Sequence, residues 1–243
     1  MCLILFAVNP DSRYRLIVAA NRDEFYARPT IQANFWSDEP DILAGRDENM
    51  GGTWLGVSRN GRFSAVTNFR EEPPDPMPPN SRGDLPLGFL KQHSAPLDYV
   101  QDVSAKGGNY RGFNLVVADS QSTCYYGNRA GEPKVLSDGC YGLSNQLLDC
   151  DWPKVIEGRS RLQALISSGT TDLVESLFDM LTTGGDEREF SNPFIRSDTY
   201  GTRAATVVVS TTDGELYFEE RNFGEHGEPL ARRDYRFNCN AGS

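Results

Sequence analysis

Pairs of short apolar runs joined by tight turns dominate the first 70 residues of the sequence. Residues 2–8 and 14–20 are rich in residues that favour β-strands, and the segment Asn9 to Arg13 between them has the composition of a turn. A second pair, 53–58 and 63–69, flanks an Asn-Gly dipeptide, which is the strongest short-range signal for a β-hairpin. The sequence therefore predicts two antiparallel hairpins, and the first of them is expected to be buried.

The rest of the chain mixes helical and strand patterns. Apolar periodicity predicts helices and further strands in the following segments: helices at 83–93, 96–105, 152–167 and 171–181, and strands at 113–118, 123–127, 141–144, 205–210, 215–220 and 235–239. Strands towards both ends with helices between them are typical of antiparallel sheets covered by helices, an α+β fold. The proline-rich stretch 71–80 is predicted to be a surface loop beside the site and not a linker, so a single domain over residues 1–243 is expected.

Composition excludes several classes of protein. The formal net charge of −10 argues against a nucleic-acid ligand, because that affinity depends on clustered Lys and Arg. No apolar run reaches the roughly 18 residues of a membrane-spanning helix. Five widely spaced cysteines without a CxxC pair, and only two histidines, predict neither a disulfide framework nor a metal site. The opening apolar run is too short for a signal peptide, so a cytoplasmic protein acting on a small molecule is expected.

The second residue is the first candidate for chemistry. Its small side chain permits removal of Met1, which would leave Cys2 with a thiol and a free α-amine. An α-amine has a pKa of about 8 and an ordinary thiol one of about 8.5, so the amine can accept the thiol proton near neutral pH. The alternative is a buried cysteine at the start of a strand.

A polar box follows the second predicted strand, at the end of the hairpin where Cys2 lies. It reads Asn21-Arg22-Asp23-Glu24. Asp23 is placed to accept from an α-ammonium at Cys2, and Arg22 is placed to favour a thiolate. The alternative is a charged turn that satisfies its own backbone.

Cys2 together with this box resembles the NRDE family, also called the transport and Golgi organisation two family. Four further stretches fit the family in the same order: Gly51–Gly56, Tyr141–Asn145, Asp151–Lys154 and Tyr200–Arg203. The family is similar to the cysteine-type N-terminal nucleophile (Ntn) hydrolases, which include penicillin V acylases and bile salt hydrolases. The resemblance implies a four-layer αββα sandwich of two mainly antiparallel sheets.

The resemblance also implies roles for individual residues. Cys2 matches the nucleophile and Asp23 the aspartate that binds its amine. The backbone N–H of Asn68 and the side-chain amide of Asn145 resemble the two donors of an oxyanion hole, which acyl transfer requires. Arg203 resembles a late arginine near the nucleophile.

Four more residues are candidates for substrate binding. Asn21 and Arg22 belong to the polar box. Arg46 lies in an Ala-Gly-Arg-Asp element that resembles one of the family and is either a pocket rim or a turn. Trp54 is either part of the core or a pocket wall.

One position departs from the acylase pattern, and it leaves two functions open. Those acylases carry an arginine three residues before the aspartate, where this sequence has Ala20; Arg22 is expected to point away from the thiol because side chains alternate along a strand. The first function is hydrolysis of a non-peptide C–N bond or other small acyl bond, with no cofactor. The second is implied by the family resemblance, because animal members have been linked to haem mobilisation and to lipid or acyl-CoA metabolism. It is a carrier or chaperone that reuses the pocket, and for haem the candidate ligands are Cys2, the other cysteines, His93 and His226. In a third reading, Cys2 is only structural.

Removal of the initiator methionine is directly measurable. The intact mass of the purified protein is expected to match the chain that starts at Cys2, and N-terminal sequencing is expected to begin with Cys-Leu-Ile. A chain that keeps Met1 would contradict the mechanism that uses a free α-amine, but not a binding role.

Overall fold

The computed structural model describes residues 2–72 and 80–239. The chain folds into two compact units. The first unit comprises Met1–Arg28, Asp138–Ser144 and Leu148–Phe237, and the second comprises Pro29–Ser137, Asn145–Leu147 and Asn238–Ser243. The expectation of one domain over the whole chain stays a prediction, and each unit is described by itself.

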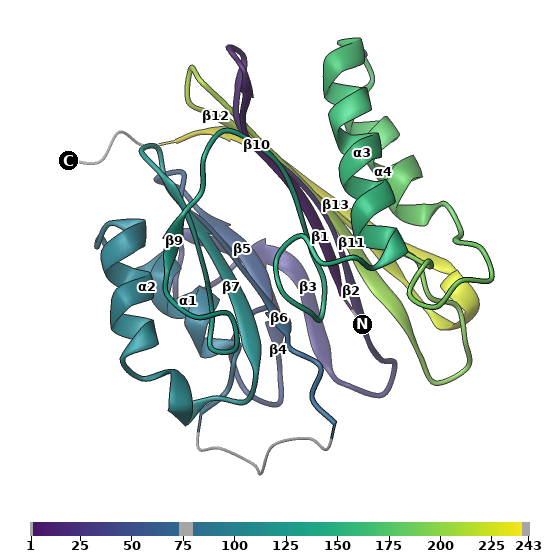
Figure 1. The fold of residues 1–243 in the computed structure, drawn as a ribbon, viewed down its shortest axis with the longest axis horizontal. Helices are drawn as coiled ribbons and strands as arrows, with labels where there is room; N and C mark the ends of the chain where they lie inside the picture. Colours follow the sequence, from purple (N-terminus) through teal and green to yellow (C-terminus); the bar gives the residue numbers. More distant parts are fainter. Residues whose placement is uncertain (1, 73–79, 240–243) are drawn as a thin grey trace. The chain divides into compact units, whose positions relative to one another are not determined.

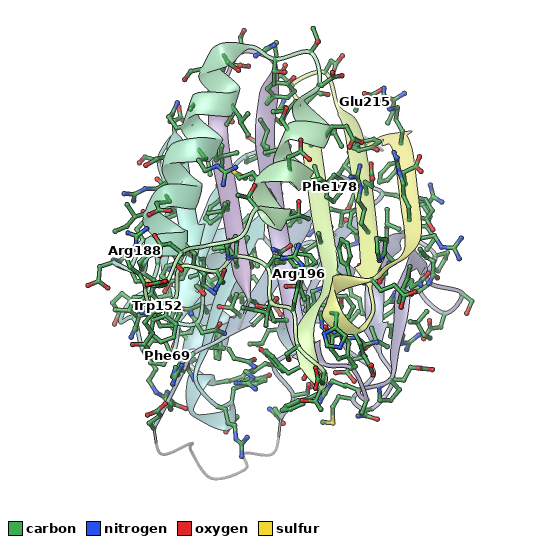
Figure 2. All side chains as sticks on the ribbon, turned by 90° about the vertical axis from the view of Figure 1, so that its right-hand side faces the viewer. Phe69, Trp152, Phe178, Arg188, Arg196 and Glu215 are labelled. Atoms are coloured by element: carbon green, nitrogen blue, oxygen red, sulfur yellow. The ribbon has the colours of Figure 1, made fainter. Side chains whose placement is uncertain are left out.

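The first unit is built on a six-stranded sheet with the strand order β10-β1-β2-β11-β12-β13. Its strands are β1 (Leu3–Asp11), β2 (Tyr14–Phe25), β10 (Gly139–Leu143), β11 (Tyr200–Thr211), β12 (Glu215–Phe223) and β13 (Pro229–Asn238). Helices α3 (Pro153–Ser168) and α4 (Leu173–Thr182) lie across one face of this sheet, as Figures 1 and 2 show. A short 3-10 turn, η2 (Glu225–Gly227), links the last two strands.

Alternating apolar side chains attach these helices to the sheet. Leu3 and Leu5 of β1 and Ile17 of β2 are fully buried and pack in one cluster with α3 and α4. Helix α3 approaches β1 closely because Gly158 has no side chain: a Cβ atom there would lie 2.6 Å from Leu5 Cδ1. The close approach fixes the start of α3 beside the first strand pair.

The second unit is built on a seven-stranded sheet with the strand order β3-β4-β5-β6-β7-β8-β9. Its strands are β3 (Thr30–Phe35), β4 (Ile42–Asp47), β5 (Leu55–Ser58), β6 (Phe63–Asn68), β7 (Phe113–Ala118), β8 (Thr123–Gly127) and β9 (Lys134–Val135). Helices α1 (Asp84–Lys91) and α2 (Pro96–Ser104) cover one face around Phe89 and Val100, and η1 (Gly107–Asn109) precedes β7. Each sheet neighbour in this unit pairs antiparallel.

A buried arginine ties α1 to the second sheet. The side chain of Arg62 donates from Nε to the Phe89 carbonyl at 3.2 Å and from Nη2 to the Ser94 carbonyl at 2.8 Å. Its guanidinium also lies 3.7 Å from the centroid of the Phe89 ring. The Phe89 carbonyl also accepts from the Gln92 N–H at 3.3 Å, so the arginine adds a second donor near the end of α1 and joins it to Ser94 in the connection to α2.

The structure confirms an α+β fold with two antiparallel sheets, and both predicted hairpins are present. The prediction that the second strand ends near Ala20 is wrong: β2 continues to Phe25, because β11 pairs with it as far as Tyr200 opposite Phe25. The strands β3, β4 and β9 were not predicted. Most of the predicted proline-rich loop, residues 73–79, lies outside the described residues. Within the described ranges, no helix is long and apolar enough to cross a membrane.

The close approach of α3 to β1 predicts the effect of enlarging Gly158. Gly158→Val is expected to lower the free energy of unfolding by about 1–3 kcal/mol, because the new side chain overlaps that of Leu5. Urea denaturation measures the change. Combination with Leu5→Ala, which opens space at the same point, is expected to cost less than the two single changes added together; additive costs would contradict the packing argument.

Candidate functional site

Cys2 lies directly before the first residue of β1 and is half-buried. The next residue, Leu3, pairs with Asn21 of β2. Ser144, the residue directly after β10, donates a hydrogen bond from Oγ to the Cys2 carbonyl at 2.6 Å. On the other side, the Cys2 thiol lies 4.0 Å from the Asp23 carbonyl oxygen. The two strands that flank β1 therefore fix the backbone of Cys2 and place its thiol beside Asp23.

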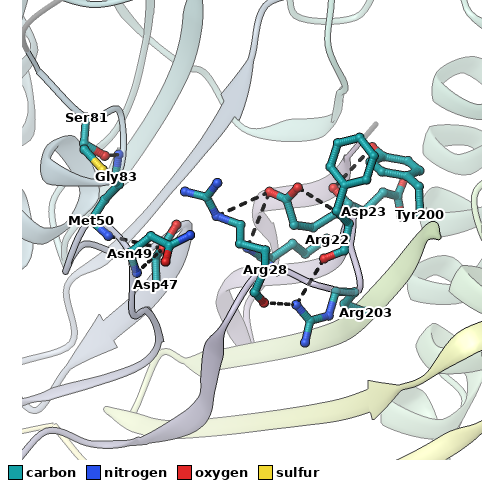
Figure 3. Close-up of polar contacts among 12 residues, drawn as sticks. Arg22, Asp23, Arg28, Asp47, Asn49, Met50, Ser81, Gly83, Tyr200 and Arg203 are labelled. Carbon is teal, nitrogen blue, oxygen red and sulfur yellow. Dashed lines mark hydrogen bonds and ion pairs between the residues drawn. The ribbon is translucent and has the colours of Figure 1, made fainter.

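Asp23 presents a buried carboxylate at this end of the sheet, with 6% of the residue exposed. Its Oδ1 accepts a hydrogen bond from Thr202 Oγ1 at 2.6 Å, and Thr202 in turn accepts from the Ile195 N–H at 2.9 Å. Tyr200 donates to the Asp23 carbonyl at 3.3 Å (Figure 3). Burial raises the pKa of the Asp23 carboxyl, whereas the Thr202 hydrogen bond and the positive charge of Lys154 act against the rise.

Arg203 sits at an irregularity in β11. The pairing of β11 with β2 shifts between Thr202 and Ala204, so Arg203 is the extra residue of a bulge. Its Nη1 donates to the carbonyls of Arg28 and of Phe25, the latter at 3.3 Å (Figure 3). Arg203, the predicted late arginine, thus holds the backbone at the end of β2 and shortly after it through these two hydrogen bonds.

The other residues of the polar box divide between the two faces of β2. Asn21 donates both amide hydrogens to backbone carbonyls, at 2.9 Å to Leu181 and 2.7 Å to Pro193. Arg22 is buried and its Nη2 lies 3.7 Å from Glu24 Oε2. Because side chains alternate along a strand, Asn21 and Asp23 share one face, and Arg22 and Glu24 share the other.

Asn68 and Asn145 are brought together within the second unit. Asn145 Nδ2 donates to the Asn68 carbonyl at 2.8 Å, and the Arg70 N–H donates to the Asn145 carbonyl at 2.8 Å. Asn114 supports the same turn by donating to the Gln146 carbonyl at 3.0 Å. The two predicted oxyanion donors are therefore neighbours, each held by backbone hydrogen bonds.

Arg46 and Trp54 also lie in the second unit. Arg46 is a residue of β4, so it lies in a strand and not in a turn; it forms a two-fold ion pair with Asp38 at 2.7 and 2.9 Å and stacks over Trp36. The ring of Trp54 occupies the space that a side chain at Gly45 would fill. Both candidates for substrate binding are thus anchored by neighbours in their own unit.

Two residues near Cys2 were not singled out from the sequence. Thr202 is fully buried and holds the Asp23 carboxylate, and Lys154 is a buried lysine in the first turn of α3. Both belong to stretches that resemble the family, Tyr200–Arg203 and Asp151–Lys154. The resemblance marked the stretches, but only the structure shows that Thr202 donates to Asp23 and that Lys154 is the buried member of its stretch.

Within residues 2–72 and 80–239, no group of three or more His, Cys, Asp or Glu side chains could hold a metal ion. His226 is exposed and lies 3.4 Å from the Asp198 carboxylate. His93 is exposed in the second unit.

Comparison with known proteins identifies the family. Residues 1–225 match the family model described as Transport and Golgi organisation 2. The chain belongs to the Transport and Golgi organisation 2 family. It is 38% identical over 260 residues to the Transport and Golgi organization protein 2 homolog of Homo sapiens, covering 91% of this chain and 93% of that protein. It is 36% identical over 259 residues to the Mus musculus homolog, with the same coverage of both chains.

This member of the Transport and Golgi organisation 2 family is similar in fold to a solved structure. The conjugated bile acid hydrolase from Clostridium perfringens, crystallised as its C2A mutant, matches with a TM-score of 0.53 and 11% sequence identity. The match covers 100% of this chain and 94% of that chain. The predicted Ntn-hydrolase-like fold is confirmed; at this level of identity, the likeness concerns the fold alone.

The buried carboxylate predicts a pH-dependent difference in stability. Because the pKa of Asp23 is raised above its ordinary value of 3.8, the folded protein favours the protonated carboxyl and loses stability as the pH rises through the folded pKa. Asp23→Asn removes this loss. The free energy of unfolding of the variant relative to wild type is therefore expected to increase from about pH 4 upward, as measured by urea denaturation at several pH values.

Asp11→Asn is the matched control for this experiment. Its hydrogen bond with Arg13 lowers the pKa of Asp11, so its variant is expected to lose stability relative to wild type as the pH rises. The effect is expected to be smaller because the pair is exposed. A relative stability of Asp23→Asn that stays flat or falls with pH would refute the assignment.

Proposed function

We propose that this protein hydrolyses an amide or another small acyl bond with Cys2 as the nucleophile. The observation that carries the proposal is the position of the Cys2 thiol, beside the buried Asp23 in a chain with an Ntn-hydrolase-like fold. One solved structure of similar fold is a bile acid hydrolase whose crystallised form is a C2A mutant, and this chain also has a cysteine at position 2.

The proposed reaction begins when removal of Met1 exposes the α-amine of Cys2. The amine accepts the thiol proton, and the sulfur attacks the substrate carbonyl carbon to form a C–S bond and an oxyanion. Collapse of this intermediate breaks the bond to the leaving group, C–N in an amide or C–S in a thioester, and the leaving group takes the proton from the α-ammonium. Water then attacks the thioester, releases the carboxylic acid and restores the thiol.

Asp23 is proposed to hold the α-amine of Cys2 in place. A carboxylate favours the ammonium form that arises when the thiol gives up its proton. Thr202 supports this role, because its hydroxyl donates to Oδ1 and directs the carboxylate from the adjacent strand. A general base that is oriented by a third group is the usual arrangement for an activated nucleophile.

Asn68 and Asn145 are proposed to stabilise the oxyanion, through a backbone N–H and a side-chain amide respectively. The hydrogen bond from Asn145 Nδ2 to the Asn68 carbonyl supports this, because it fixes the plane of the Asn145 amide. Donors that are oriented in advance need no reorganisation as charge develops, and loss of one typically lowers the rate about 10²- to 10³-fold.

The test is a panel of N-acyl amides and thioesters incubated with wild type, Cys2→Ala and Cys2→Ser. Wild type is expected to hydrolyse at least one class, and Cys2→Ala to lower the rate by about 10³-fold or more, because removal of the nucleophile leaves only binding and oxyanion stabilisation. Mass spectrometry of the N-terminal peptide is expected to detect an acyl group on Cys2. Cys140→Ala, which alters another partly buried thiol of the first unit, is the control and is expected to retain activity.

Equal rates for wild type and Cys2→Ala across the panel would refute the hydrolase proposal. A haem titration of the same samples separates it from the carrier alternative. A saturable Soret shift that persists in Cys2→Ala, together with no hydrolysis of any substrate, would favour a carrier for haem.

A further inference from the structure

The side chain of Asn114 is the centre of a buried hydrogen-bond network in the second unit. The residue belongs to β7 and is fully buried. Its Nδ2 donates to Thr67 Oγ1 at 3.2 Å and to the Gln146 carbonyl at 3.0 Å. Its Oδ1 accepts from the Tyr125 hydroxyl at 2.7 Å. Because a carbonyl oxygen only accepts, the Gln146 contact fixes which end of the amide is the donor.

An apolar residue is the ordinary choice at the position of Asn114. The other five residues of β7 are apolar and buried, and Asn is depleted in strands. A buried carboxamide is tolerated only when its donors and its acceptor are paired. The polar side chain therefore points to a purpose other than the packing of the sheet.

The neighbouring strand β8 makes room for this amide and orients it. Gly127 pairs with Asn114, and a Cβ atom at Gly127 would lie 2.8 Å from Asn114 Oδ1. Tyr125, two residues earlier on β8, is 3% exposed and directs its hydroxyl to the same oxygen. Glycine, like Asn, is depleted in strands. Two adjacent strands thus carry unfavourable residues that together hold one carboxamide in a single orientation.

The two hydrogen bonds from Asn114 Nδ2 reach the two segments that carry the proposed oxyanion donors. Thr67 directly precedes Asn68 at the end of β6. Gln146 directly follows Asn145 in the segment after β10. Asn145 Nδ2 in turn donates to the Asn68 carbonyl at 2.8 Å. These three hydrogen bonds close a ring through both segments, so the strand and the loop are joined at two points.

We propose that Asn114 is a positioning residue that holds the two oxyanion donors, Asn68 and Asn145, at a fixed spacing, and that Tyr125 orients its amide. The inference rests on the proposed function and deepens it, because it explains how a donor from a strand and a donor from a loop are fixed before a substrate binds. Oxyanion donors act through their preorganisation, and a misplacement of about 1 Å can lower a rate about 10²-fold.

The test compares two reactions of Cys2, only one of which forms an oxyanion. With p-nitrophenyl acetate, the sulfur adds to the acetyl carbon to form an oxyanion, and collapse releases p-nitrophenolate and leaves an S-acetyl group, while the thiol proton passes to the α-amine. With iodoacetamide, the sulfur displaces iodide directly. The ratio of the acylation to the alkylation rate constant therefore reports the oxyanion site, whereas a change in the exposure or ionisation of the thiol alters both rates.

Acylation is followed as first-turnover release of p-nitrophenolate, with the Cys2→Ala form of each variant as the blank, and alkylation by mass spectrometry of the N-terminal peptide. The wild-type ratio is expected to exceed that of the free peptide Cys-Leu-Ile about 100-fold or more, and Asn145→Ala to remove most of this excess. Asn114→Leu is expected to lower the ratio about 10- to 100-fold at an unchanged alkylation rate. Tyr125→Phe, which removes one hydrogen bond, is expected to lower it about fivefold.

Two matched variants separate this role from a general effect on the sheet. Tyr126→Phe removes a hydroxyl from the next residue of β8, which packs in the apolar cluster that includes residues of α2. Ser64→Ala removes a buried hydroxyl of β6 that donates to the Val116 carbonyl at 3.3 Å. Both are expected to keep the wild-type ratio. A thermal unfolding transition verifies that each variant is folded, and if Asn114→Leu does not fold, Tyr125→Phe decides.

The outcomes distinguish this inference from the proposed function. A wild-type ratio in the folded Asn114 and Tyr125 variants, alongside a low ratio in Asn145→Ala, would overturn the positioning role and leave the proposed function intact. A parallel fall of both rate constants at a constant ratio would also overturn it, because only the structure would then depend on Asn114. A wild-type ratio no higher than that of the free peptide would contradict the oxyanion site itself, and this inference with it.

Discussion

The cost of burying the Asp23 carboxylate is the constraint on which the arrangement of the first unit depends. An ionised carboxylate is stable inside a protein only with hydrogen bonds or an opposite charge close by. Thr202 supplies the hydrogen bond, and so β11 must run beside β2 with its bulge placed directly after Thr202. Lys154, buried in the first turn of α3, adds a positive charge that acts against the rise in the pKa of Asp23. The buried carboxylate thus depends on residues from a neighbouring strand and from a helix.

Local rules were sufficient for much of the fold. The Asn-Gly turn and the alternation of apolar residues predict the hairpin of β5 and β6, because turn geometry fixes the pairing of adjacent strands. The strands β3 and β4 escaped prediction because polar residues and Gly45 interrupt their apolar pattern. The polar second half of β2, residues 21–25, was not predicted to be strand because its hydrogen-bond partners are distant in the sequence. Asp23, for example, accepts a hydrogen bond from Thr202, which lies 179 positions further along the chain.

The same distinction applies to the site. The proximity of Cys2 to Asp23 could be predicted from the sequence, because a thiol at position 2 and a polar box at the end of the same hairpin are local features. The burial of Lys154 could not, because a lysine in the first turn of a helix is ordinarily solvated. Its burial depends on the close approach of α3 to the sheet, which a pattern of apolar residues along one helix does not specify.

The alternation of side chains along β2 gives this strand a sharp sensitivity to register. Asp23 and Asn21 share one face, and Arg22 occupies the other. Because the repeat of a strand is two residues, a slip of one position exchanges the two faces. Loss or gain of a single residue in the turn between β1 and β2 would then bring a guanidinium to the point where the carboxylate now stands. The length of that short turn, remote from the thiol, therefore determines whether an acidic or a basic side chain lies on the face that now carries Asp23.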